Sequence, residues 1–173
     1  LLPPGRILNL GAGERAPDRA SQRFVNLDLR RPHTAMPTFV QGDAARLPFR
    51  DGSFDGALLK DVVEHVPDPL RVLRETRRVC RPGARIALTT PRAIPRAVWD
   101  DPTHVRGFTA RAITEALAVT GWEPVGRPRR IGALPGAGRL GLEARLVDVM
   151  RIPLLGHWFG TNWLVTAHRS SGP

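Results

Sequence analysis

The sequence predicts an α/β fold in which a parallel β-sheet is covered by helices on both faces. Short apolar segments alternate along the chain with segments of helical periodicity, and this order is typical of a parallel sheet. The early apolar segments carry hydrophobic side chains on both sides, as strands buried on both faces require. The 173 residues suit one domain, and we find no linker that would divide residues 1–173.

The first half of the chain contains the strands that we expect at the centre of the sheet. They are predicted at residues 6–10, 24–29, 38–41 and 54–59. These strands end in small or acidic residues, and in open α/β sheets ligands bind beyond the carboxyl ends of the strands. We therefore expect the functional site at this edge of the sheet.

The chain after residue 60 adds two helices with clear end signals. The first is predicted at residues 69–81, with Pro69 near its start, and the second at residues 109–120, where Thr109 can cap the helix. The remaining predictions are strands at residues 84–90, 122–125 and 162–168, loops at 91–106 and 127–141, and a third helix around 140–150.

Basic residues outnumber acidic ones, and the formal net charge is +10. This excess indicates either a solvated arginine-rich surface or a basic face for phosphate, nucleic acid or anionic lipid. Arginines at helical spacing predict a solvated face on the first helix, and they are Arg71, Arg74, Arg78 and Arg81. The single cysteine, Cys80, cannot form an internal disulfide, so we expect a buried thiol and a cytoplasmic protein.

A membrane-spanning segment is not expected. The stretch from residue 152 to residue 167 has no acidic residue, lysine or arginine, but it is shorter than a membrane span and interrupted by glycine and proline. This stretch contains Trp158 and Phe159, so peripheral contact with a lipid surface stays open as an alternative.

Glycines and acids at the strand ends indicate a nucleoside ligand. Gly11-Ala12-Gly13 follows the first predicted strand, where a glycine turn lets the backbone approach a ligand closely. Asp28 ends the second strand, where a carboxylate can accept hydrogen bonds from a ribose diol, and Asp43 follows the third, where it can accept from an adenine amine. Together they predict an adenosine moiety. A nicotinamide dinucleotide is disfavoured because the complete G-x-G-x-x-G pattern is absent.

Several longer segments carry a resemblance to a known family. They are residues 7–13 (ILNLGAG), 25–28 (VNLD), 42–49 (GDAARLPF), 51–55 (DGSFD), 63–66 (VEHV) and 78–83 (RVCRPG). With this set, the sequence from residue 7 to about residue 125 resembles the class I S-adenosylmethionine-dependent methyltransferases of the type 11 kind. The resemblance implies a Rossmann-like, mostly parallel sheet with an antiparallel last strand, and S-adenosylmethionine as the cofactor.

The resemblance also implies roles for residues at the strand ends. Gly11 and Gly13 should pass under the methionine part of the cofactor, Asp28 should hold the ribose hydroxyls, and Leu29 should lie against the adenine. Lys60 and its neighbour should border the methionyl group and the substrate. The full set of expected cofactor-binding residues is Asn9, Leu10, Gly11, Ala12, Gly13, Asp28, Leu29, Gly42, Asp43, Ala44, Lys60, Asp61 and His65.

Catalysis of methyl transfer depends on aligning nucleophile, methyl group and sulfur, and a hydroxyl nucleophile usually also needs a base. His104, in a polar loop, is the first candidate for this base; the alternative is that it orders the loop through Asp100 or Asp101. His65 is the second candidate. Arg106 could bind an anionic group of the acceptor. Scattered histidines and one cysteine offer no ligand spacing, so we expect no metal site.

Residues 131–160 form an insertion that we expect to roof the acceptor site, with Trp158 available to stack on a sugar ring. The alternative is that this segment packs against the domain or forms a homodimer contact. Residues 101–109 (DPTHVRGFT) resemble methyltransferases often associated with glycan and polysaccharide biosynthesis. The expected acceptor is therefore a hydroxyl of a sugar, a glycan or a small natural product.

Two alternative functions stay open. The basic charge allows methylation of nucleic acid, although basic and aromatic residues do not alternate as single-strand binding would require. The chain could also be a cofactor-binding or scaffold subunit without chemistry of its own. Two departures from the family pattern motivate this alternative: Asn9 stands where family members often carry an acid, and Arg15 stands where many have a third glycine.

Overall fold

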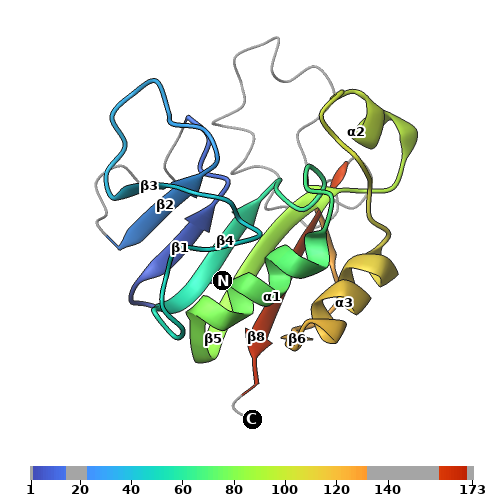
Figure 1. Ribbon diagram of the computed structural model, residues 1–173. Helices are drawn as coiled ribbons and strands as arrows, with labels where there is room; N and C mark the ends of the chain where they lie inside the picture. Colours follow the sequence, from blue (N-terminus) through green and yellow to red (C-terminus); the bar gives the residue numbers. More distant parts are fainter. Residues whose placement is uncertain (1, 15–22, 132–159, 171–173) are drawn as a thin grey trace.

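The structure, a computed structural model, describes residues 2–14, 23–131 and 160–170. The order along its sheet is β3 (Phe39–Gln41), β2 (Phe24–Asp28), β1 (Ile7–Leu10), β4 (Phe54–Lys60), β5 (Cys80–Pro91), β8 (Asn162–Arg169) and β6 (Trp122–Pro124), with β7 (Arg129–Ile131) also paired to β8. Neighbours from β3 to β5 are parallel, whereas β8 is antiparallel to β5, β6 and β7 (Figure 1). The predicted mostly parallel sheet with an antiparallel last strand is confirmed.

The strand order places the ligand-binding edge. From β1 the chain builds the sheet outward through β2 and β3, and then returns to add β4 on the other side of β1. This reversal creates a crevice at the carboxyl ends of β1 and β4, which is where open α/β sheets bind ligands. The fold therefore brings the turn after Leu10 next to the segment after Lys60.

The two predicted helices are present with their end signals. α1 (Pro69–Val79) begins after Asp68, whose side chain accepts a hydrogen bond from the backbone N–H of Arg71 at 2.9 Å. α3 (Ala110–Val119) begins after Thr109, which caps it in the same way. Figure 1 shows the two helices side by side on one face of the sheet. None of the described helices is long and apolar enough to cross a membrane.

Two short elements were predicted as loops. α2 (Pro95–Trp99) is a single short helix that begins at a proline, and β7 is an arginine-rich strand that pairs with β8. Both predictions were wrong because neither segment has the apolar periodicity from which helices and strands are recognised. β5 also begins four residues earlier than predicted, because Cys80 is already extended and pairs with Phe54. The helix predicted around residues 140–150 lies outside the described residues.

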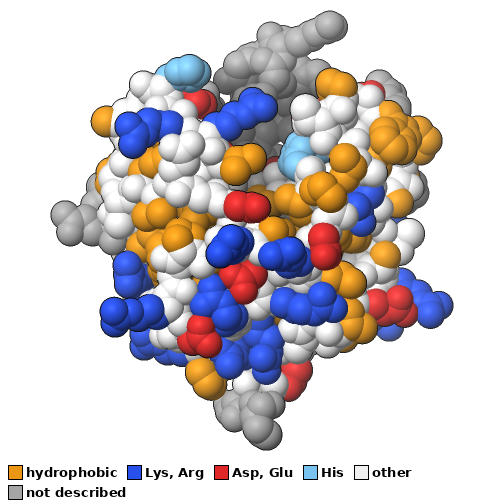
Figure 2. Space-filling model, in the orientation of Figure 1, with side chains coloured by type: hydrophobic (Ala, Val, Ile, Leu, Met, Phe, Trp, Pro, Cys, Tyr) orange, Lys and Arg blue, Asp and Glu red, His pale blue; other side chains and the backbone are white. Residues whose placement is uncertain are grey.

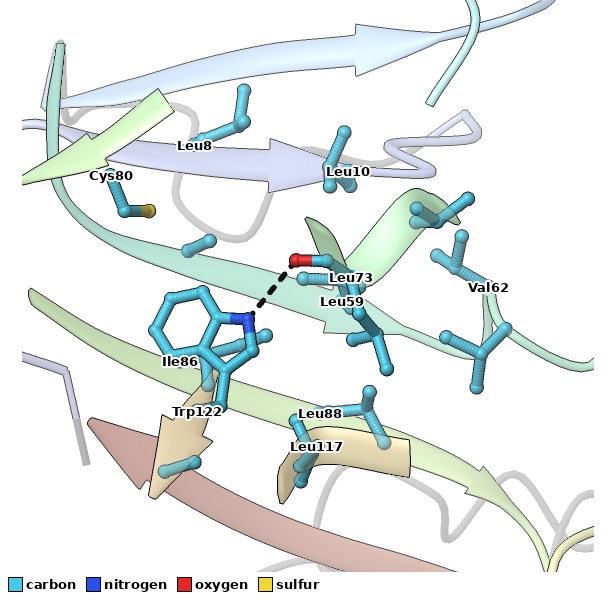
Figure 3. Packing of buried hydrophobic residues seen from close by; sticks show 14 of the residues in the cluster. Leu8, Leu10, Leu59, Val62, Leu73, Cys80, Ile86, Leu88, Leu117 and Trp122 are labelled. Carbon is cyan, nitrogen blue, oxygen red and sulfur yellow. Dashed lines mark hydrogen bonds between the residues drawn. The ribbon is translucent and has the colours of Figure 1, made fainter. Parts of the chain in front are cut away.

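The core lies between the sheet and the two helices. Trp122 on β6 is 1% exposed, and its indole Nε1 donates to the backbone oxygen of Leu73 on α1 at 3.1 Å. Figure 3 shows this ring among leucine and isoleucine side chains from the central strands. Cys80 is fully buried in the same core, and burial raises the pKa of its thiol to about 12. The prediction of a buried thiol is confirmed.

The arginine face of α1 is only partly the solvated surface that was predicted. Arg71, Arg74 and Arg81 are exposed, and Figure 2 shows arginine and acidic side chains interspersed over this face. Arg78 is different, because its side chain is two-thirds buried and bonded to Glu75. The expectation was wrong for Arg78, since helical spacing does not reveal that the loop before β4 packs over that position.

Candidate functional site

The turn after β1 has a backbone that favours glycine. Gly11 and Gly13 both have positive φ angles, of +65° and +55°. A Cβ atom on Gly11 would lie 2.5 Å from Cγ2 of Val62, whereas one on Gly13 would meet nothing within 4 Å. Gly11 is thus required both by its φ angle and by the close approach of the segment after β4. The contact joins the two sides of the crevice.

Asp28 is fixed at the end of β2. Its Oδ2 accepts from the backbone N–H of Gly13 at 2.8 Å, and its Oδ1 accepts from that of Arg30 at 2.9 Å. A carboxylate oxygen can accept two hydrogen bonds, so each oxygen keeps an acceptor position for a hydroxyl group. Leu29 follows with 67% of its surface exposed, which leaves an apolar platform beside the carboxylate.

The next strand end brings a second acid to the same edge. The backbone N–H of Gly42 donates to the carbonyl of Asp28 at 3.0 Å, which ties the end of β3 to the end of β2. Asp43 is exposed, and its Oδ1 accepts from the backbone N–H of Ala45 at 2.8 Å. Ala44, the residue between Asp43 and Ala45, is half-buried. The structure therefore brings Asp28 and Asp43 to the same sheet edge.

Asn9, Leu10 and Ala12 are buried in or next to β1. The side chain of Asn9 donates from Nδ2 to Oδ1 of Asn26 at 2.9 Å, between directly paired positions of β1 and β2. Asn26 in turn donates to the carbonyl of Pro37 at 2.8 Å. This link stabilises the strand pair from inside. The expected contact of Asn9 with the cofactor stays a prediction.

The end of β4 holds Lys60 and Asp61. Lys60 is exposed, whereas Asp61 adopts the left-handed region with φ +53°. Its Oδ1 accepts from Oγ1 of Thr89 at 2.8 Å and from Nδ2 of Asn162 at 3.1 Å. β5 and β8 thus hold a strained backbone in place, a feature that clusters at functional sites. The sequence analysis did not identify Thr89 or Asn162, and no local pattern marks either residue.

Glu64 is a buried acid that the sequence analysis also missed. Its side chain is completely buried; Oε2 accepts from Thr90 at 3.1 Å, and Oε1 has no hydrogen-bond partner among the residues that the structure describes. Burial raises the pKa of Glu64 to about 7, and the carboxylates of Asp61 and Asp101 act in the same direction. A charged residue directly after two buried valines was the signal that could have found it.

Both candidate catalytic histidines lie against this acid. Glu64, His65 and His104 each offer a ligand atom, and these atoms lie within 4.8 Å of one another. The two imidazole centroids are 4.6 Å apart. His104 Nδ1 lies 2.8 Å from the carbonyl of Val98, and its Nε2 lies 3.8 Å from Asp101. Because a carbonyl only accepts, Nδ1 of His104 carries a proton and Nε2 keeps a lone pair when the ring is neutral.

The ring of His65 is oriented in the same manner. Its Nδ1 lies 3.0 Å from Oγ1 of Thr103, and this hydroxyl donates to Asp101 at 2.6 Å. Having given its proton to Asp101, the hydroxyl accepts from Nδ1 of His65, so Nε2 of His65 also keeps its lone pair. Hydrogen bonds from Thr103 lower the pKa of Asp101 and keep it ionised.

The proposed acceptor-binding residues are only partly described. Arg106 donates from Nη2 to the carbonyl of Pro67 at 2.7 Å, and its buried Nε has no hydrogen-bond partner within residues 2–14, 23–131 and 160–170. Its contact with an acceptor stays a prediction. Trp158 and residues 132–159 of the expected roof lie outside the described residues.

The chain is similar in sequence to known methyltransferases. Residues 9–88 match a family model described as a methyltransferase domain. A probable S-adenosylmethionine-dependent methyltransferase of Mycolicibacterium smegmatis is 30% identical over 144 residues, which cover 81% of this chain and 51% of that protein. The 27-O-demethylrifamycin SV methyltransferase of Amycolatopsis mediterranei is 33% identical over 82 residues, 47% of this chain and 29% of that protein.

A solved structure shows the same fold. The 1,6-didemethyltoxoflavin-N1-methyltransferase of Burkholderia thailandensis, with bound 1,6-didemethyltoxoflavin and S-adenosylhomocysteine, superimposes with a TM-score of 0.67 at 21% identity. The match covers 97% of this chain and 72% of that one. The chain spans about half or less of the length of the first curated relatives that it matches.

Proposed function

We propose that this chain, which belongs to the class I S-adenosylmethionine-dependent methyltransferases, methylates a hydroxyl group of a sugar, a glycan or a small natural product. The observation that carries the proposal is the position of His65 and His104. Both rings keep an Nε2 lone pair in the segments that follow β4 and β5. An oxygen nucleophile needs help in losing its proton, whereas an amine with a free lone pair does not.

The residues at the strand ends fit the cofactor. Asp28 presents fixed carboxylate oxygens for the ribose hydroxyls, and the exposed side chain of Leu29 offers a surface for the adenine. The turn at Gly11 has no side chain that would block the methionine part. Asp43 stands one strand further, where it can accept from the adenine amine. Asn9 is the exception, since its amide is already bonded to Asn26.

The bound cofactor supplies an electrophilic methyl group on a sulfonium. The chain contributes position and proton removal. Asp61, held by Thr89 and Asn162, stabilises the turn that borders the methyl group. Nε2 of His104 can take the proton of the acceptor hydroxyl or bind a cation that makes this hydroxyl more acidic. Both routes turn the hydroxyl into a better nucleophile.

Two further observations support an oxygen acceptor. A relative that is 33% identical is named as a methyltransferase of 27-O-demethylrifamycin SV, a natural product. Residues 101–109, which resemble glycan-associated methyltransferases, form the loop that carries His104. The toxoflavin enzyme with the same fold is named for an N1 position, so amine acceptors belong in the same assay.

Cofactor binding can be tested at Asp28. We expect Asp28→Ala to weaken binding of S-adenosylmethionine by about 10- to 100-fold, because hydrogen bonds to a charged group are worth ~1.5–3 kcal/mol. Isothermal titration calorimetry measures the affinity. Glu115→Ala, which removes an exposed carboxylate on α3, should leave it unchanged. Equal affinity of Asp28→Ala and the parent protein would remove Asp28 from the ribose site.

The acceptor step can be tested at His104. His104→Ala should lower the turnover number at least about tenfold on a hydroxyl acceptor, while cofactor affinity stays nearly unchanged. A panel of sugars, natural-product alcohols and amines with labelled cofactor provides the assay. His168→Ala, which removes a histidine of β8 that is paired with Glu123 on β6, is the matched control. Full turnover by His104→Ala would exclude a role in catalysis.

A further inference from the structure

We infer that Glu64, His65 and His104 bind a divalent first-row transition-metal cation that holds the acceptor hydroxyl beside the methyl donor. The inference rests on the proposed function, because it assigns how that site activates its acceptor. It departs from the expectation of no metal site, which considered only the spacing of ligands along the chain. Glu64 and His104 are brought together because the loop after β5 packs against the turn after β4. There the backbone N–H of Val105 donates to the backbone carbonyl of Glu64 at 2.9 Å.

The donor atoms are prepared as in known metal sites. A metal-bound histidine usually donates its other ring N–H to a carbonyl or a similar acceptor, which fixes the ring and its tautomer. His104 does so to Val98, and His65 does so to Thr103. Both Nε2 lone pairs are thereby left as ligands. One possible ligand atom from each of the three residues lies within 4.8 Å of those of the other two, so shifts of about 1 Å would bring such atoms to metal-bond distances of ~2.0–2.2 Å.

One oxygen of the buried Glu64 carboxyl group lacks a hydrogen-bond partner among the described residues. Within the part of the chain that the structure describes, Oε1 of Glu64 is buried without a hydrogen bond, and the acids Asp61 and Asp101 act on this residue with like charge. A cation between the carboxylate and two neutral imidazoles would satisfy the orphaned oxygen and offset this negative charge. Two imidazoles with one carboxylate suit manganese, iron, cobalt or zinc better than magnesium or calcium, which prefer oxygen ligands.

The position gives the cation a role in methyl transfer. Three protein ligands leave coordination positions open, as in catalytic metal sites. The segment from Asp61 to His65 runs beside the glycine turn after β1, since Val62 contacts Gly11. An acceptor hydroxyl held at the cation loses its proton to water; its oxygen then forms the C–O bond as the C–S bond breaks and the electron pair leaves with sulfur. The cation itself is neither oxidised nor reduced.

Metal binding can be measured without any turnover. The full chain, stripped with a chelator, is titrated with Co²⁺ and followed by visible absorption and by calorimetry. We expect one saturable site, weakened more than about tenfold in Glu64→Gln, His65→Ala and His104→Ala. His168→Ala should bind normally, and circular dichroism checks the fold of each variant. Absence of saturable binding, or equal binding in folded Glu64→Gln and His104→Ala, would overturn the inference.

A second measurement separates this inference from the proposed function. The stripped protein should still bind S-adenosylmethionine, and its methyl transfer should return only when a metal ion is added. Full transfer in the presence of chelator would show that the cluster acts as a base, so the metal site would be refuted while the methyltransferase proposal stands. If the parent protein bound the metal ion but did not bind S-adenosylmethionine, the proposed function would be contradicted instead.

Discussion

Arg78 shows how one side chain can join several parts of this protein. Its guanidinium donates to both carboxylate oxygens of Glu75, to Asp51 at 2.6 Å, and to the carbonyls of Phe49 and Leu47. These contacts fasten the loop between β3 and β4 to α1. The hydrogen bond from Arg78 lowers the pKa of Glu75. The bonds to Glu75 and Asp51 in turn raise the pKa of Arg78, so Glu75 and Arg78 both stay ionised.

Replacing Arg78 tests how much these hydrogen bonds contribute to stability. We expect Arg78→Ala to lower the free energy of unfolding by about 2–3 kcal/mol, since it removes charge-assisted bonds and leaves their acceptors without a donor. Urea denaturation measures the loss. Arg74→Ala, an exposed arginine on the same helix, should change stability by less than about 0.5 kcal/mol. Similar losses in the two variants would contradict a special role for Arg78.

The same pair predicts a pH dependence. The pKa of Glu75 is lowered in the folded protein, so its contribution is complete above its ordinary value of 4.5 and is lost as the pH falls through the lowered value. The difference in stability between the parent protein and Arg78→Ala should therefore shrink in acid. A difference that stayed constant across the acid range would argue against this linkage.

At the scale of the element, local chemistry explains where the helices begin. In α1, Asp68 precedes Pro69, and its carboxylate accepts from the N–H of Arg71. The apolar stripe of this helix, which includes Val72 and Leu73, is fully buried. These signals involve neighbours in the chain, so they were readable in the sequence. β7 was not readable, because it pairs with β8, more than thirty residues later.

The helix cap gives a prediction for the element as a whole. Asp68→Ala should lower the free energy of unfolding by about 1 kcal/mol, the usual loss when an N-cap acceptor is removed. Asp68→Asn keeps an acceptor oxygen and should retain most of the stability. Thermal or urea unfolding of the parent protein and the two variants measures these differences in stability. An Asn variant as unstable as the Ala variant would mean that the charge of Asp68, not its hydrogen bond, stabilises α1.

At the scale of the whole molecule, Trp122 connects the layers of the core. Its ring lies between the helices and the sheet, and its Nε1–H bonds to Leu73 across 49 positions of sequence (Figure 3). Trp122→Phe should lower the free energy of unfolding by about 1–3 kcal/mol, through the lost hydrogen bond and the smaller ring. Chemical denaturation provides the value.

Trp99 offers the matched comparison, since its side chain is 65% exposed at the end of α2. Trp99→Phe should change stability by less than about 0.5 kcal/mol. If both tryptophan replacements cost the same, burial of Trp122 would not explain its contribution.

The sequence by itself determined the order of the strands and helices other than α2 and β7, the glycine turn and the acids at the strand ends. Apolar periodicity, capping residues and turn residues act between neighbours, so Gly11, Asp28 and the start of α1 follow from local pattern. The family resemblance rests on those same local segments. It implied cofactor roles for Asn9 and the others, and those roles stay predictions.

Only the tertiary structure decided which distant side chains meet. Asn162 reaches Asp61 across 101 positions, Asn9 bonds inward to Asn26, and Glu64 lies against His104. Such contacts depend on strand register and on how loops pack over the sheet edge. Because no local pattern encodes that packing, the sequence indicated a cofactor edge but not the buried acid beside the two histidines.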